Sequence, residues 1–285
     1  MTPVQDLIAA GLSAPVDPRV TAMAAALAAQ YGAASRTVLF YGSCLRTAEL
    51  DGLMLDFYLI VSDYGAAYGK SWLATANRLV PPNVFPFEYK GLVAKYAVLS
   101  EADFRSLCGP DASTVSVWAR FAQPSRLVWA ADHAARSHAA EAIALAPTTL
   151  LALTPAQADS DPLDRWRRGF TLTYGAELRA ERGGRPESIV DFDPEHYRRL
   201  GALIPDAQAP GLDRKWRALR RNGKWLTLVR LAKASLTFAG GIDYLAWKIN
   251  RHAGTQIAIR PWQRRFPILG ALTLLPRLLA RGAVR

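Results

Sequence analysis

Hydrophobic and polar positions in the first third of the chain predict a small sheet with flanking helices. Apolar residues at helical spacing predict an Ala-rich amphipathic helix over Pro18–Tyr31. Two apolar runs, Thr37–Tyr41 and Asp56–Val61, predict strands, because each is short and rich in branched and aromatic residues. Gly42-Ser43 follows the first run and predicts a turn between the strands.

The pattern beyond the second strand predicts a helix and then a hairpin. Tyr64–Asn77 has helical periodicity, which Pro81-Pro82 interrupts. Val84–Lys90 and Leu92–Ser100 alternate as strands and turn at Lys90-Gly91, so they extend the same sheet. Ser100 is a helix-capping residue, and a helix is predicted from Glu101.

From Ser113 onward the periodicity is helical. Candidate helices are Val128–Ala144, Leu163–Ala180 and Pro194–Leu203, separated by breaks rich in Pro and Asp. No internal repeat or low-complexity tract interrupts the chain.

Composition places the chain among folded proteins of a reducing compartment. Its 285 residues are 51% hydrophobic, which is enough for a core. Only Cys44 and Cys108 are present, so a disulfide framework or a cysteine metal site is disfavoured. The N-terminal residues lack the basic start and apolar core of a secretory signal, and we expect a cytoplasmic location.

Charge is distributed unevenly along the chain. Residues 211–285 carry 16 Lys and Arg against Asp213 and Asp243, a net charge of +14. The first 210 residues carry 19 basic and 22 acidic residues, a net of −3, which together give the total of +11. The C-terminal part is therefore expected to seek an anionic surface.

The basic C-terminal part also contains two apolar segments, residues 224–251 and 266–280. Neither has the roughly 20 uninterrupted apolar residues that a membrane span requires. Both mix apolar residues with Lys and Arg and lie near Trp225, Trp247 and Trp262, as do segments in a membrane interface. A helical subdomain with solvated Arg residues explains the same pattern equally well.

The candidate chemistry lies at Gly42, Ser43, Arg46 and Asp56. A strand, a Gly-Ser turn and a second strand that opens with a carboxylate are the parts of a nucleotidyltransferase site. Gly42 allows the backbone to approach a phosphate, and Ser43 is placed to cap a short helix. Asp56 is placed to hold Mg²⁺ or another divalent cation against phosphate oxygens. The alternative is a plain strand-turn-strand unit.

The usual pair of carboxylates, Asp-x-Asp, is incomplete in this sequence. Tyr58 occupies the second position counted from Asp56, and Met54 occupies the first position counted backward. Candidates for the missing ligand are Asp51, Asp63 and Glu88, and we predict Glu88. The four histidines are scattered and have no metal-ligand spacing.

Several segments resemble the mitochondrial-type phosphatidate cytidylyltransferases, also called the translocator assembly and maintenance family. The similar segments are YGSC at Tyr41–Cys44, LDFYLIVSDY at Leu55–Tyr64, GLVAKYAVLS at Gly91–Ser100, VWARFAQPSRLVW at Val117–Trp129 and TYGAELR at Thr173–Arg179. The resemblance covers about residues 38 to 180 and then the basic tail. It indicates a divergent, bacterial-type member, since the stretch after the Asp56 strand is shorter and lacks histidine.

The resemblance implies the reaction CTP + phosphatidate → CDP-diacylglycerol + pyrophosphate, with Mg²⁺. It implies a catalytic role for Asp56 and Lys95 and nucleotide contacts from Tyr96. Phosphate or lipid-headgroup contacts would come from Arg120, Tyr174 and Arg179, with Glu177 as the motif's acid. The partners are then CTP and phosphatidate in an anionic membrane surface, and the protein would be peripheral on the inner face of the cell membrane.

We therefore predict an α/β fold of the α+β type with a nucleotidyltransferase-like small mixed sheet. The predicted regions are residues 1–110 (nucleotidyltransferase-like), 111–210 (helical) and 211–285 (basic, amphipathic and membrane-associating). Two other hypotheses remain open: a transferase acting on RNA or another phospholipid, and a membrane-bound pseudoenzyme. The apolar content of the tail disfavours nucleic acid, and the sequence leaves the oligomeric state open.

Overall fold

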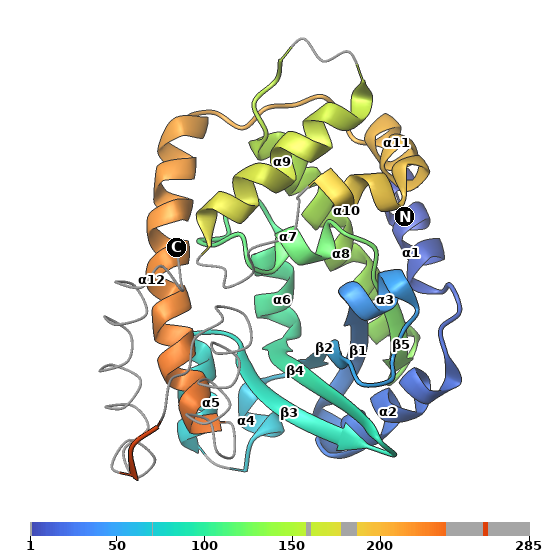
Figure 1. The fold of residues 1–285 in the computed structure, drawn as a ribbon, viewed down its shortest axis with the longest axis vertical. Helices are drawn as coiled ribbons and strands as arrows, with labels where there is room; N and C mark the ends of the chain where they lie inside the picture. The colour runs from blue at the N-terminus through green and yellow to red at the C-terminus, as the bar shows by residue number, and fades with distance from the viewer. Residues whose placement is uncertain (1, 70, 158–160, 178–186, 238–258, 262–285) are drawn as a thin grey trace.

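A computed structural model shows a five-stranded mixed sheet with helices on both faces (Figure 1). It describes residues 2–69, 71–157, 161–177, 187–237 and 259–261. The spatial strand order is β3-β4-β2-β1-β5, with β2 and β4 parallel and the other three pairings antiparallel. The strands are β1 Ser35–Tyr41, β2 Met54–Val61, β3 Asn83–Tyr89, β4 Leu92–Ser100 and β5 Arg126–Ala130. The predicted α+β class is confirmed.

The helices precede, connect and follow these strands. Their bounds are α1 Pro3–Leu12, α2 Pro18–Ala29, α3 Ser43–Thr47, α4 Tyr64–Ala67, α5 Ser71–Leu79, α6 Glu101–Cys108, α7 Trp118–Phe121, α8 His133–Leu153, α9 Pro162–Ala176, α10 Glu187–Phe192, α11 Pro194–Leu203 and α12 Leu212–Thr237. A short 3₁₀ turn, Gly32–Ala34, leads into β1.

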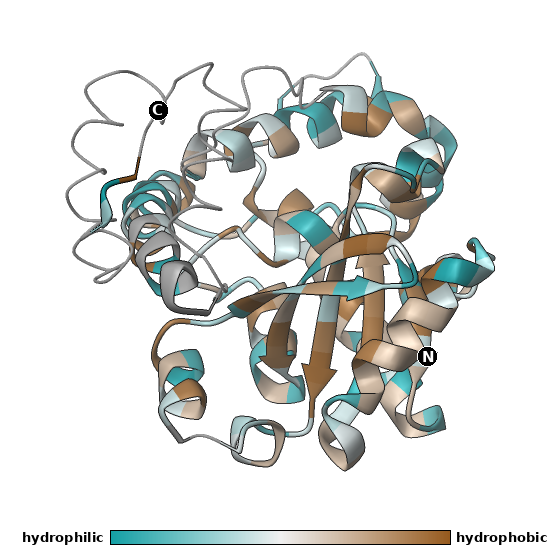
Figure 2. Cartoon of the chain, turned by 60° about the horizontal axis from the view of Figure 1, so that its bottom comes forward, coloured by the Kyte–Doolittle hydropathy of each residue, from teal (hydrophilic) through white to brown (hydrophobic). Residues whose placement is uncertain are grey.

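Two apolar cores cover the two faces of the sheet. Alternation along β2 sends Leu55, Phe57 and Leu59 into a core with α2. Tyr58 and Ile60 point to the other face, where the larger core with α6 to α9 lies. Figure 2 shows the strands as a largely hydrophobic layer between the helices. We call the Tyr58 side of the sheet the helical-domain face.

The local signals of the hairpin and caps are confirmed. Lys90 and Gly91 both have positive φ, 46° and 81°, which suits a two-residue turn between twisted strands. Ser100 caps α6 by accepting a hydrogen bond from the Asp103 amide at 3.1 Å. The single helix predicted over Tyr64–Asn77 is instead two helices, α4 and α5.

The region 111–210 is not wholly helical, because it contributes β5 to the sheet. Arg126–Ala130 pairs antiparallel with β1, although the predicted helix Val128–Ala144 included its last residues. The helix in this segment begins instead at His133, capped by Asp132. The larger core also runs without a break from α1 to α12, so the regions divided at residue 110 share one core.

Helix α12 joins the C-terminal region to the folded body. Trp216 and Leu219 are buried in the larger core, and the Trp216 indole N–H donates to the Leu153 carbonyl at 2.7 Å. Figure 1 shows α12 along one side of the molecule. In the described part of the chain, no helix combines the length and apolar character that crossing a bilayer requires. Residues 238–251 and the segment 266–280 lie outside the described residues.

Candidate functional site

The turn after β1 brings the backbone of Gly42 against the carboxylate of Asp56. Gly42 has φ +94°, which L side chains rarely adopt. Asp56 lies next to this turn, because Tyr41 and Asp56 are partners in the β1–β2 register. A Cβ on Gly42 would lie 3.0 Å from Asp56 Oδ2. Both backbone angle and space therefore favour glycine here.

Lys95 completes this part of the site from the neighbouring strand. It is the register partner of Asp56 on β4, and its Nζ lies 3.0 Å from Asp56 Oδ1. The exposed fractions are 17% for the Asp56 side chain and 34% for Lys95, so both groups remain accessible. The structure thus brings together the two residues predicted to be catalytic, with one carboxylate oxygen toward Lys95 and the other toward Gly42.

Two tyrosines form the apolar wall beside Asp56. Tyr58 shares the face of Asp56, as the period of two along a strand requires, and its ring centroid lies 5.4 Å from that of Tyr41. Both rings contact Phe121 of α7. Burial raises the pKa of both hydroxyls, and the Asp56 carboxylate raises that of Tyr41 further. Tyr58 is therefore a core residue, and it stands where Asp-x-Asp would place a second carboxylate.

Arg120 of α7 brings a cation to this wall. Its guanidinium donates to the Ser116 carbonyl and lies 3.8 Å from Glu177 Oε1, and its charge partly offsets the rise in the Tyr41 pKa. Burial lowers the pKa of Arg120, but Glu177, followed by Tyr58 and Tyr41, outweighs burial and raises it. The Glu177 side chain is only 8% exposed. Arg120 is consequently a fixed positive charge between Asp56 and Glu177.

Helix α12 brings a second arginine to the same region. Arg230 donates from Nε to the Pro81 carbonyl at 2.8 Å and from Nη1 to the Ser116 hydroxyl at 3.1 Å. Ser116 thus joins both arginines, through its carbonyl to Arg120 and through its hydroxyl to Arg230. The region thus holds three cations, Lys95, Arg120 and Arg230. Its carboxylates are those of Asp56 and Glu177, so the net charge is positive and suits an anionic ligand.

Lys233 fastens α12 to the loop before β3. Its Nζ donates to the Pro82 carbonyl at 2.9 Å and to the Val80 carbonyl. Burial, reinforced by the charge of Arg230, lowers the pKa of Lys233 to about 7. The pKa of a lysine in an unfolded chain is about 10.4. The unfolded chain therefore binds more protons between pH 7 and 10, and stability rises with pH in this window.

We expect this rise to disappear in Lys233→Met. The free energy of unfolding of the wild type should increase by about 2 kcal/mol from pH 7 to 9 relative to the variant. Urea unfolding at several pH values measures the difference. Lys224→Met, an exposed change on the same helix, should keep the wild-type profile. Parallel profiles for the wild type and Lys233→Met would disprove the assignment.

Two of the predicted ligands do not lie at this site. Tyr96 faces the opposite side of the sheet from its neighbour Lys95, and its hydroxyl lies 3.1 Å from that of Tyr31. Glu88 lies on β3 opposite Val93, with β4 between it and Asp56. The backbones of Glu88 and Asp56 are two strand spacings apart and offset by two residues along the strands, roughly 12 Å in all, so the sheet does not make the two residues neighbours.

The other two candidates for the missing carboxylate have structural roles. Asp51 pairs with Arg19 at 2.8 Å on the surface. Asp63 caps α4 by accepting from the amides of Gly65 and Ala66. Asp56 thus has no second carboxylate from the predicted set.

The other residues predicted to contact the substrate lie in different parts of the structure. Ser43 is exposed and is the first residue of α3, whose cap is Gly42, so the predicted capping role of Ser43 is wrong. Arg46 hydrogen-bonds Gln123 at 3.3 Å, which links α3 to the segment after α7. Tyr174 is half-buried on α9 and packs on the larger core. Arg179 lies outside the described residues.

The residues around Asp56 fit a cation that is shared with a substrate. Within the described ranges, no group of three or more His, Cys, Asp or Glu side chains could hold a metal. Mg²⁺, however, is commonly bound by one or two carboxylates together with substrate phosphates. Asp56 is such a carboxylate, because its side chain is 17% exposed and one of its oxygens faces the Gly42 backbone.

No protein-family profile matches this chain, and no curated protein matches it. The functional argument therefore depends on the geometry around Gly42, Asp56, Lys95 and Arg120. Of the residues that form this region, Arg230 carried no sequence signal, because it is one of 16 basic residues in the last 75. Tyr58 did carry one, since it is two residues from Asp56 on the same strand.

Proposed function

We propose that this protein is a nucleotidyltransferase that transfers the cytidylyl group of CTP to phosphatidate, giving CDP-diacylglycerol and pyrophosphate. The observation that supports it most is the contact between the Gly42 turn and the Asp56 carboxylate, with Lys95 at 3.0 Å on the next strand. The choice of CTP and phosphatidate rests on the sequence resemblance.

The turn would hold the nucleotide. At Gly42 no Cβ blocks the approach of a phosphate, and Ser43 exposes its backbone and hydroxyl at the same turn. Arg46, one helical turn on, would contact the triphosphate. Asp56 would hold Mg²⁺, which when bound neutralises phosphate charge.

The reaction would need positioning more than a strong base. A phosphate oxygen of phosphatidate forms the new bond to the α-phosphorus of CTP, and the bond from that phosphorus to the bridging oxygen breaks. The electron pair leaves with pyrophosphate. Because the attacking oxygen is already anionic, charge neutralisation and alignment supply most of the acceleration. Lys95 would offset the charge that develops on pyrophosphate, and Arg120 would orient the lipid phosphate.

Phosphatidate would be reached from the membrane surface, on the cytoplasmic side. The exposed side of α12 carries Arg217, Arg221, Lys224 and Trp225, and Trp225 is 66% exposed. Basic residues beside an exposed Trp are typical of contacts with anionic headgroups. We call these four residues the α12 stripe. Trp216 and Leu219 of α12 are buried, so substitutions on the exposed side of this helix test membrane binding without disturbing the core.

Replacing the α12 stripe should weaken vesicle binding at least 10-fold. The variant combines Arg217→Gln, Arg221→Gln, Lys224→Gln and Trp225→Ser, and each basic residue near an anionic surface contributes about 1 kcal/mol. Co-sedimentation with phosphatidate-containing vesicles measures the partition.

The matched control removes three exposed arginines elsewhere: Arg136→Gln, Arg198→Gln and Arg199→Gln. It should bind vesicles within about threefold of the wild type, because distant charges are screened at physiological salt. Equal losses in both variants would show a general charge effect, and unchanged binding of the stripe variant would remove the α12 stripe from the mechanism.

The transfer itself is tested with labelled CTP, Mg²⁺ and the full chain. Vesicles of phosphatidate, vesicles of phosphatidylcholine and a mixed RNA pool serve as separate acceptors. The proposal predicts label in the organic extract with phosphatidate alone. Label in RNA would favour the RNA transferase, and label with another phospholipid would change the lipid substrate.

One observation favours a second candidate, a membrane-bound pseudoenzyme. Of the carboxylates predicted to accompany Asp56, Asp51 and Asp63 have other partners, and the Glu88 backbone lies roughly 12 Å from that of Asp56. Such a protein would keep the fold and the α12 stripe without transfer. Vesicle binding with no product from any nucleotide and acceptor would support it.

A further inference from the structure

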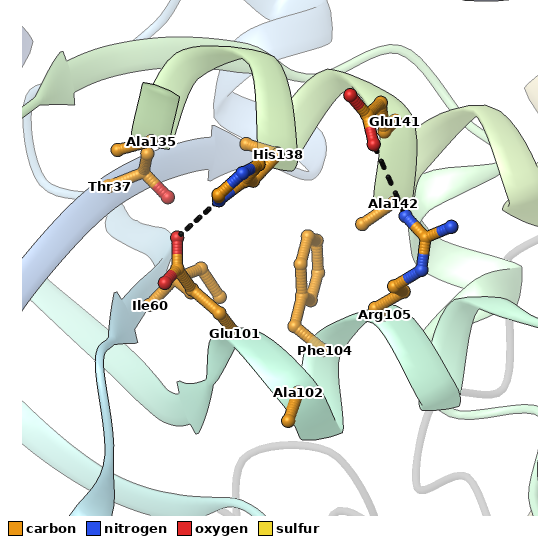
Figure 3. A pocket seen from close by; sticks show the side chains of 11 residues that line it. Thr37, Ile60, Glu101, Ala102, Phe104, Arg105, Ala135, His138, Glu141 and Ala142 are labelled. Carbon is orange, nitrogen blue, oxygen red and sulfur yellow. Dashed lines mark hydrogen bonds and ion pairs between the residues drawn. The ribbon is translucent and has the colours of Figure 1, made fainter. Parts of the chain in front are cut away.

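A hollow lies on the helical-domain face between α6 and α8, away from Asp56 (Figure 3). Its volume is about 300 Å³. Thr37 and Ile60, register partners on β1 and β2, form its base. The Tyr41–Asp56 pair is four residues farther along β1, roughly 13 Å away. The hollow is therefore separate from the site described above, and the inference does not depend on the proposed transferase function.

The floor and inner walls of this hollow are apolar. Ile60 and Phe104 are 2% and 1% exposed, and Ala135, Ala139 and Ala142 of α8 present only methyl groups. Figure 3 shows the Phe104 ring between the His138–Glu101 pair and the Arg105–Glu141 pair, below the small side chains of α8. A hollow of this size and lining suits the apolar body of a small molecule.

One buried polar group in the hollow has no partner. The Thr37 hydroxyl is buried, the residue being 1% exposed, and it makes no hydrogen bond to the described residues. Figure 3 shows this oxygen turned toward the space between Glu101 and His138. An unsatisfied buried hydroxyl is unfavourable, so a ligand with a hydrogen-bonding group there would be favoured.

The charged groups at the rim favour a cation. Glu101 and Glu141 line the hollow with one guanidinium, Arg105, and one imidazole, His138. The His138–Glu101 and Arg105–Glu141 distances are both 3.4 Å, longer than a strong charge-assisted hydrogen bond of about 2.8 Å. Both carboxylates therefore retain acceptor capacity.

The arginine behind Glu101 is engaged elsewhere. Arg36 lies 3.4 Å from Glu101 but 2.8 Å from Asp132, to which it makes two hydrogen bonds. Glu101 is thus only loosely paired, next to the unpartnered Thr37 hydroxyl.

We propose that this hollow binds a small organic ammonium with an apolar body. The ammonium lies between Thr37 Oγ1 and the Glu101 carboxylate, where both accept its hydrogen bonds. The body packs on Ile60 and the Phe104 ring. The Glu101 carboxylate repels an anion of the same shape, and a neutral isostere keeps the apolar contacts and loses the ion pair.

Phenethylammonium is the probe, and titration calorimetry or ligand-observed NMR with the full chain measures its binding. Phenethyl alcohol and phenylacetate are the neutral and anionic comparisons. The proposal predicts at least 10-fold weaker binding of the alcohol and no detectable binding of phenylacetate. Equal binding of the alcohol and the ammonium, or no binding of the ammonium at millimolar concentration, would overturn it.

Two variants locate the probe. Glu101→Gln should weaken ammonium binding about 10-fold and leave the alcohol unchanged, whereas Glu195→Gln on exposed α11 should change neither. Ala102→Trp places a large ring at the exposed rim without entering the core, and it should abolish binding of both probes. Ammonium binding that survives both Glu101→Gln and Ala102→Trp would assign it to another place.

Discussion

Asp56→Asn is expected to lower cytidylyl transfer by about 100- to 1000-fold, the usual loss when a group that stabilises transition-state charge is removed. Asparagine keeps the shape of the side chain but loses its charge, so it binds a divalent cation poorly. The Asp56 oxygens face Lys95 on one side and Gly42 on the other. The substitution would therefore remove the negative charge from the contact with Lys95 and from the contact with the Gly42 turn.

Asp51→Asn is the matched control for this prediction. Asp51 lies five residues before Asp56, and its side chain is 82% exposed and paired with Arg19. Its loss should change transfer by less than about twofold, because a surface ion pair contributes less than about 1 kcal/mol. Initial rates with saturating CTP give the comparison, and thermal unfolding confirms that both variants are folded. A rate for Asp56→Asn within threefold of the wild type would exclude Asp56 from the chemistry.

Gly223→Ala should destabilise the protein by about 1–3 kcal/mol, the usual cost of overpacking. Gly223 is buried on α12 where that helix crosses the end of α9, and a Cβ there would collide with the Ala176 carbonyl oxygen. Helix propensity alone predicts the opposite change in stability, because alanine is favoured over glycine inside a helix by about 1 kcal/mol. Only the contact with α9 reverses this preference.

Gly175→Ala on α9 separates packing from helix propensity. No atom lies within 4 Å of a Cβ built at Gly175. This variant should therefore be stabilised by about 0.5–1 kcal/mol. Urea unfolding of both variants decides the matter: opposite signs support the close approach of α12 to α9, and stabilisation by both would contradict it.

Loss of this approach would also affect the site. Glu177 follows Ala176 directly and pairs with Arg120, while α12 carries Arg230 to Ser116. Gly223→Ala is thus expected to lower transfer as well as stability, because it displaces both arginines of the site.

The parts of the fold that could be predicted from the sequence depend on local signals. Pro18 and Asp17 start α2, Lys90-Gly91 turns the hairpin, and Ser100 caps α6. Each signal acts within a few residues, so one sequence suffices to detect it. The Gly42 turn beside Asp56 belongs to this class.

The strand β5 depends on pairing over a long distance in sequence. Only five residues, Arg126–Ala130, form it, and it is a strand because it pairs with β1, some ninety residues earlier. The apolar residues of β5 directly precede a helical pattern, and the periodicity of a short apolar run does not distinguish a strand from a helix. The predicted helix therefore began inside the strand.

Tyr96 illustrates an error that the sequence itself could have prevented. Lys95 and Tyr96 are consecutive on β4, and consecutive strand residues face opposite sides of the sheet. Once Lys95 was assigned to the Asp56 face, Tyr96 belonged to the other face, where it contacts Tyr31. Arg120, Glu177 and Arg230 came together only through the packing of α7, α9 and α12, which no local pattern indicates.

The most direct test of the central claim is the fate of each phosphorus of CTP. The full chain is incubated with Mg²⁺, phosphatidate vesicles and CTP labelled at either the α- or the γ-phosphorus, beside Asp56→Asn. Nucleotidyl transfer predicts the α label in the lipid extract and the γ label in pyrophosphate, with both lost in the variant. Label from the γ-phosphorus in the lipid would indicate a kinase, and product formation unchanged by Asp56→Asn would contradict the proposed site.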